Sequence, residues 1–108
     1  MKLDRAETIF LHVTAKIKVA EAAGTTADIF LNDAWHAMVL ESEAPAVLYI
    51  RNERFTAKLR TWQLLVRGPA ADTSSALLLS EGTHAGVRAR VNTPDEQIVR
   101  YIGDIEVC

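Results

Sequence analysis

Side chains that could bind an anion stand close together near the end of this chain of 108 residues. Arg88 and Arg90 alternate with the apolar residues of the segment 86–92, so on a strand both would share one face. Two neighbouring guanidinium groups can hold a carboxylate or a phosphate through paired hydrogen bonds. The spacing therefore indicates an anionic ligand. The alternative is a solvent-exposed face whose arginines pair with carboxylates on a neighbouring strand.

Two histidines have a carboxylate close by in the sequence. Asp33 precedes His36 by three residues, and on a helix it would orient the imidazole or share a metal ion with it. Glu81 and His84 stand in the glycine-bracketed segment "EGTHAG", where they could act as an acid–base pair. Neither pair has a third metal ligand nearby in the sequence, so we predict no metal site and no cofactor. Ordinary solvated residues explain both pairs as well.

The bulk composition is that of an ordinary soluble domain. Apolar residues make up 49% of the chain, charged residues make up 24%, and the net charge is −2. So small a charge gives no overall attraction to nucleic acid or to a membrane surface. The lone Cys108 cannot form an internal disulfide, and no apolar run suits a signal peptide or a membrane span. We expect a single cytoplasmic domain over 1–108, without a membrane or nucleic-acid partner.

Hydrophobic periodicity predicts the elements that position these residues. Residues 9–19 alternate with period two and indicate a strand, although Asp4, Glu7 and Gly24 could instead bound a long helix. The segment 26–41 is predicted as a helix, because Thr25 and Asp28 resemble a capping box and apolar residues cover most of its circumference. A continuous apolar run at 46–51 indicates a central strand. Strands at 75–80 and 86–92 are expected to form a hairpin around "EGTHAG".

The segment 52–67 carries five of the 12 basic residues together with its neighbour Arg51. Its apolar residues Phe55, Leu59, Trp62 and Val66 recur at helical spacing between an N-capping Asn52 and a terminating Gly68. A strand would need a bulge near Arg60 to keep its apolar residues in phase. We therefore predict a helix that packs on the core and is solvated by its basic residues.

The C-terminal segment has two interpretations. Thr93-Pro94-Asp95-Glu96 can begin a helix, here predicted over 94–102 and followed by an edge strand over 104–107, or it can form a type I turn. The whole pattern predicts the order β-α-β-α-β-β-α, possibly with a last short strand. That is an α+β domain, with two to three helices on one mixed sheet.

Three functions fit this pattern. The first is a small soluble binding domain without an evident catalytic motif, working as a homodimer with an apolar small-molecule pocket. The second is a module that binds a different protein through the predicted helix 26–41. The third is a small enzyme that uses His36 with Asp33 or His84 with Glu81, although we lean against catalysis. The residues expected to bind the ligand are Trp62, Tyr49, Tyr101, Arg88, Arg90 and His84, and those expected at the dimer interface are Trp35, Met38 and Val39.

Overall fold

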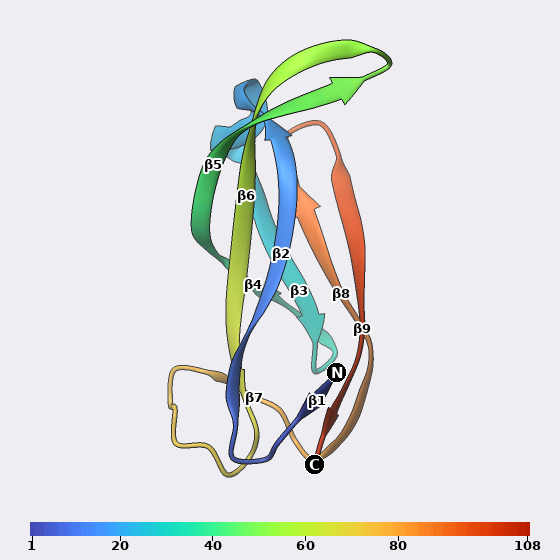
Figure 1. The fold of residues 1–108 in the computed structure, drawn as a ribbon. Helices are drawn as coiled ribbons and strands as arrows, with labels where there is room; N and C mark the ends of the chain where they lie inside the picture. The colour runs from blue at the N-terminus through green and yellow to red at the C-terminus, as the bar shows by residue number, and fades with distance from the viewer.

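Two β-sheets packed on each other form the computed structural model, which describes residues 1–108 (Figure 1). The first sheet has the strand order β1-β9-β8-β3-β4, and the second has the order β2-β6-β5, with the short β7 also paired to β6. The elements are β1 (Lys2–Leu3), β2 (Thr8–Lys18), the 3₁₀-helix η1 (Val19–Gly24), β3 (Thr26–Leu31), β4 (Ala34–Ala37), β5 (Val39–Ile50), β6 (Glu53–Arg67), β7 (Leu77–Leu78), β8 (Gly82–Asn92) and β9 (Gln97–Val107).

Alternating residues of the strands fill the space between the two sheets. In β8 the buried residues are Val87, Ala89 and Val91, and in β2 every second residue from Leu11 to Ile17 is buried. Trp62 of β6 lies opposite Val13 of β2 and is only 3% exposed, which makes it the largest side chain of the core. This alternation is what a sheet with one covered face requires.

The predicted α+β fold is wrong, because η1 is the only helical element of the chain. The predicted helix 26–41 consists of β3, β4 and the first residues of β5. Asn32 and Asp33 have φ angles of 51° and 58°, which close β3 and β4 into a two-residue hairpin. The segment resembles an all-round apolar helix because β3 buries one face in the core while its other face packs Phe30 against Trp35.

The predicted helix 52–67 is also wrong, because the segment is the strand β6 between β2 and β5. No bulge is needed within β6, since its register with β2 is continuous from Thr8 opposite Arg67 to Lys18 opposite Ala57. Lys58 and Arg60 occupy positions opposite the buried Ile17 and Ala15 and therefore point to the inner side. Because the charged Lys58 and Arg60 occupy inner positions, the apolar residues of β6 do not alternate with a period of two along the whole strand. The sequence therefore did not indicate a strand.

The C-terminal segment turns at Thr93–Glu96 and does not begin a helix, but its hydrogen bonds are not those of the expected type I turn. The backbone N–H of Thr93 donates to the Glu96 carbonyl over 2.9 Å, and the Thr93 hydroxyl accepts from the Glu96 N–H over 3.0 Å. This turn leads from β8 into the long strand β9, so the predicted helix 94–102 is wrong and the segment 104–107 is the end of β9. Val99, Tyr101 and other strand-forming residues explain the preference for a strand.

The remaining strand predictions are partly confirmed. The strands at 9–19 and 86–92 correspond to β2 and β8. The run 46–51 belongs to β5, but β5 pairs only with β6 and is an edge strand, not a central one. The hairpin around "EGTHAG" does not exist, because β7 lies in the second sheet, β8 lies in the first and most of that segment is already in β8. No helix of the structure has the length and apolarity to cross a membrane.

The end of the β5–β6 hairpin extends past the rest of the second sheet. Because β2 ends opposite Ala57, residues 47–56 pair only with each other, and we call them the arm. Figure 1 shows the arm bending over the end of the sandwich, in a molecule that measures 48 × 22 × 19 Å. The Lys18 ammonium lies 4.3 Å from the centre of the Phe55 ring, and Lys16 Nζ donates to the Val47 carbonyl over 3.4 Å. These contacts hold the base of the arm on β2.

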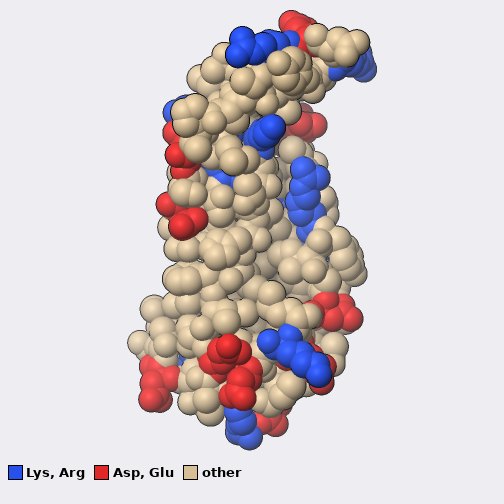
Figure 2. Space-filling view, in the orientation of Figure 1, with Lys and Arg blue, Asp and Glu red and all other residues tan.

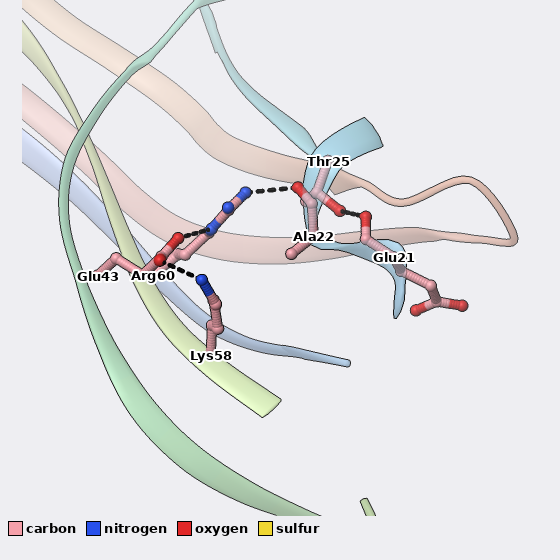
Figure 3. A network of polar contacts seen from close by, with 6 residues as sticks. All are labelled: Glu21, Ala22, Thr25, Glu43, Lys58 and Arg60. Carbon is pink, nitrogen blue, oxygen red and sulfur yellow. Dashed lines mark hydrogen bonds and ion pairs between the residues drawn. The ribbon is translucent and has the colours of Figure 1, made fainter. Parts of the chain in front are cut away.

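A polar network fastens η1 to the second sheet at the base of the arm (Figure 3). Glu43 accepts hydrogen bonds from Lys58 Nζ and Arg60 Nε, each over 2.7 Å, and Arg60 Nη1 donates to the Ala22 carbonyl over 2.6 Å. The bond from Lys58, followed by the one from Arg60, lowers the pKa of Glu43. The inward charges of β6 are therefore satisfied at this end of the sandwich.

Candidate functional site: the arginine–aromatic face

Four neighbouring strands bring arginine and aromatic side chains together on the outer side of the first sheet. The register places Phe30 of β3 between Trp35 of β4 and Arg88 of β8, and it places Arg88 opposite Tyr101 of β9. Directly opposed residues of a sheet share a face, and every second residue along each strand returns to it. The residues that form this arginine–aromatic face are Phe30, Trp35, Arg88, Arg90, Val99 and Tyr101.

The two guanidinium groups are stacked on the aromatic rings. Arg88 Cζ lies 4.3 Å from the centre of the Phe30 ring and 5.6 Å from that of Trp35, and Arg90 Cζ lies 4.0 Å from the Trp35 ring. The two rings meet edge to face, with their centroids 5.3 Å apart. Cation–π contacts of this kind contribute about 0.5–1 kcal/mol each at exposed sites. They restrict the rotamers of both arginines, so less entropy is lost when a ligand binds.

The two arginines differ in their charged partners. Arg90 Nε donates to Asp28 Oδ2 over 3.0 Å, and Asn92 Nδ2 donates to the same oxygen over 3.0 Å. Arg88 makes one hydrogen bond, from Nη1 to the Gly86 carbonyl over 3.3 Å, and no ion pair. A guanidinium carries five N–H donors. Arg88 therefore keeps most of its hydrogen-bonding capacity and its net charge for a ligand.

Tyr101 completes the surroundings of Arg88. Its side chain is 73% exposed, and its hydroxyl would lie 3.4 Å from a Cβ atom placed on Gly86. Gly86 has a φ of +68°, a conformation that glycine adopts without steric cost. The phenol therefore lies over the backbone beside Arg88 and can donate a second hydrogen bond to an anion that Arg88 holds. Val99, 54% exposed, adds apolar surface next to it.

Several residues predicted to act with this face lie elsewhere. Trp62 and Met38 are buried in the core, so neither is exposed to bind a ligand or to form an interface. Tyr49 is exposed on the arm, and Val39 is exposed at the start of β5. Of the predicted ligand and interface residues, the sheet gathers only Trp35, Arg88, Arg90 and Tyr101 on one face.

The two proposed acid–base pairs are not joined by a hydrogen bond or an ion pair. His36 Nε2 lies 2.9 Å from the Leu31 carbonyl, and Asp33 is in the turn between β3 and β4. Glu81 pairs instead with Arg5, with 2.8 Å between Nη1 and Oε1, while His84 Nε2 lies 2.9 Å from the Ser80 carbonyl. His84 also lines a cleft of about 320 Å³ together with Phe30 and Asp33. No group of three or more His, Cys, Asp or Glu residues is placed to hold a metal ion.

Sequence reasoning missed Phe30 and Val99 as members of the face. Both belong to segments assigned to helices, although "ADIFL" and "QIVRY" contain the β-branched and aromatic residues that are common in strands. Comparison of the chain with protein-family models, with curated proteins and with solved structures finds no match.

Proposed function

We propose that this chain is a non-catalytic protein-binding module that holds an acidic segment of another protein on the arginine–aromatic face. The observation that carries the proposal is Arg88, a guanidinium stacked on two rings and without a carboxylate partner. Trp, Tyr and Arg are the residues most enriched among those that dominate the binding energy of protein interfaces. All three types meet here on one surface, where Tyr101 is exposed and Trp35 and Arg88 are half-buried.

The form of the face favours an extended protein segment over a small molecule. Small-molecule sites are concave and bury most of their ligand. The aromatic rings here stand on the outer side of a sheet, and Trp62, the expected wall of an apolar pocket, is buried in the core. The Arg88 guanidinium would hold a carboxylate while the rings and Val99 contact neighbouring side chains of the bound segment.

The distribution of charge supports a protein ligand more than a nucleic acid. Figure 2 shows acidic and basic side chains interspersed on one side of the molecule, over a largely uncharged surface. A nucleic-acid interface gathers its Lys and Arg residues in a patch or a stripe. On the arginine–aromatic face, Asp28 already neutralises Arg90, which leaves one unpaired charge. One charge suits recognition of single carboxylates better than recognition of a phosphate backbone.

Binding of a carboxylate-rich probe tests this function. A hexaglutamate peptide, titrated by calorimetry, should bind the wild-type chain and should bind Arg88→Gln at least about tenfold more weakly, because a charge-assisted contact is lost. Arg54→Gln, which removes an exposed arginine from the arm, is the matched control and should leave the affinity unchanged. Equal losses in both variants would contradict a specific role of the face. Tighter binding of inorganic phosphate than of the peptide would point to a phosphate ligand instead and would overturn the proposal.

A further inference from the structure

The edge strands of the two sheets differ in how they are protected from pairing with other strands. β5 carries Pro45 and a bulge between Leu40 and Ser42, the outer face of β2 ends in Lys16 and Lys18, and β4 has only four residues. Prolines, bulges, lysines and short length are the usual means by which natural proteins block edge-to-edge association. Three of the four sheet edges are therefore protected from pairing with a strand of another molecule.

The edge of β9 has one such feature, a bulge at Ile102, but residues 97–101 before it have no proline, lysine or bulge. β1 pairs only with Glu106 and Val107, so the remainder of that edge has no neighbouring strand. Residues 97–103, "QIVRYIG", contain no proline, no lysine and no acidic residue. An exposed apolar edge strand of this kind is a site of strand addition.

The backbone N–H and C=O groups of this edge point alternately toward β8 and away from it. Thr93 N–H donates to the Glu96 carbonyl, which makes Thr93 and Glu96 a hydrogen-bonded pair between β8 and β9. Hydrogen-bonded positions alternate along an antiparallel strand. Glu96, Ile98 and Arg100 therefore direct their backbone groups toward β8. Gln97, Val99 and Tyr101 direct theirs outward, where a further strand would bind them.

The side chains along this edge are complementary to a second copy of themselves. If two β9 strands run antiparallel and are centred on Ile98, Glu96 of each copy lies opposite Arg100 of the other, and the two Ile98 side chains meet. Gln97 then lies opposite Val99 of the second copy, and both residues direct their backbone groups into the new pairing. The charges, the apolar centre and the hydrogen-bonding positions thus agree on one register.

The charged residues of this register have no ion-pair partner within the chain. All four ion pairs of the structure involve other residues, and both Glu96 and Arg100 are exposed. Glu96, Ile98 and Arg100 line a cleft of about 440 Å³, and its other walls are Thr14, Ala15 and Lys16 of β2, Leu59 of β6 and Leu48 and Ile50 of the arm. A second copy of Ile98 would have apolar surface to contact there.

We propose that two copies of this chain associate through β9, antiparallel and centred on Ile98, so that their first sheets join into one continuous sheet. The two-fold axis of such a pair is perpendicular to the sheet, as in other closed dimers that use the same surface twice. Both arginine–aromatic faces then lie on the same side of the joined sheet. The dimer does not depend on what that face binds.

Variants that exchange the charges of Glu96 and Arg100 test this dimer. Sedimentation velocity over a concentration series measures its dissociation constant. The wild-type chain should dimerise, and Glu96→Arg or Arg100→Glu should each weaken the dimer at least about tenfold, because two attractive pairs become repulsive. The double variant Glu96→Arg/Arg100→Glu should dimerise again, and an equimolar mixture of the two single variants should form a heterodimer. Glu41→Arg, on the defended edge of β5, is the matched control and should behave as the wild type.

Each other outcome would overturn the proposal. A wild-type chain that stays monomeric, single variants that dimerise normally, or a double variant that stays monomeric although folded would exclude this interface. High salt should also weaken the wild-type dimer, because exposed ion pairs are screened. That measurement needs no variant, and a dimer that salt does not weaken would contradict the Glu96–Arg100 pairs of this register.

Discussion

Two arginines two residues apart have different roles because of one neighbouring carboxylate. Asp28 neutralises Arg90, whereas Arg88 has only aromatic rings and a backbone carbonyl as partners. The alternation within β8 was visible in the sequence and placed both arginines on one face. The role of Asp28 was not visible in the sequence, because only the pairing of β3 with β8 brings Asp28 opposite Arg90.

Removing the charge of Asp28 should strengthen the binding of acidic peptides. Asp28→Asn keeps an oxygen that can accept from Asn92 but frees Arg90, so we expect a several-fold gain in affinity for hexaglutamate, measured by calorimetry. Asp72→Asn, at an exposed carboxylate that makes no ion pair, is the control for the change in net charge. Unchanged affinity in Asp28→Asn would mean that Arg90 contributes nothing to recognition, and a loss of affinity would contradict the role of Asp28 as a competitor for Arg90.

Glu43 should make the stability of the fold sensitive to acid. Its pKa is lower in the folded chain than the usual value of 4.5, so its contribution is complete above that value and is lost as the pH falls through the folded pKa. Thermal unfolding of the wild type and of Glu43→Gln, followed from neutral pH to pH values below 4.5, should give curves that converge on acidification. A constant difference between the two would contradict this origin of the effect.

Glu21 acts in the opposite sense and serves as the internal comparison. The neighbouring Asp95 carboxylate, to which a protonated Glu21 can donate a hydrogen bond, raises the pKa of Glu21 above 4.5. Its contribution is therefore present at low pH and is lost as the pH rises through the folded pKa. Glu21→Gln, which keeps this side chain neutral, should match the wild type at low pH and be more stable than the wild type at neutral pH, whereas Glu43→Gln should be less stable there.

Strands in which apolar and polar residues alternate without interruption could be predicted from the sequence, and the other strands could not. β2 and the end of β8 keep one apolar face throughout and were predicted correctly. β6 was not, because Lys58 and Arg60 occupy inner positions whose charges are satisfied by Glu43 and by the Ala22 carbonyl, both distant in sequence. The β3–β4 hairpin was missed because Asn32-Asp33 was interpreted as part of a helix.

The turn at the tip of the arm can be improved by design. Arg51 and Asn52 both have positive φ angles, 51° and 66°, as in the two-residue turns that favour Asn-Gly. A residue such as Arg in this conformation costs about 1–2 kcal/mol, whereas Asn and Gly adopt it more readily. The double variant Arg51→Asn/Asn52→Gly should therefore slow amide hydrogen exchange in residues 47–56. Glu53→Gln, beside the turn, should not. Faster exchange in the double variant would contradict the assigned turn.

The molecule as a whole is a two-sheet sandwich whose first sheet carries two separate surfaces. The outer face presents Arg88 among aromatic rings, and the edge of β9 presents a self-complementary strand. Both depend on β8 and β9 being neighbours, a pairing across the Thr93–Glu96 turn that the sequence left open between helix and turn. If the dimer forms, two binding faces stand side by side and a partner with two acidic segments gains avidity.

The binding face itself can be located by the backbone amide signals of an isotope-labelled sample during titration with hexaglutamate. We expect the largest shifts at Phe30, Trp35, Arg88 and Tyr101, and we expect the signals of the arm to stay in place. Shifts that concentrate on the arm or on the cleft beside His84, or no shifts at all, would contradict the assignment of the arginine–aromatic face.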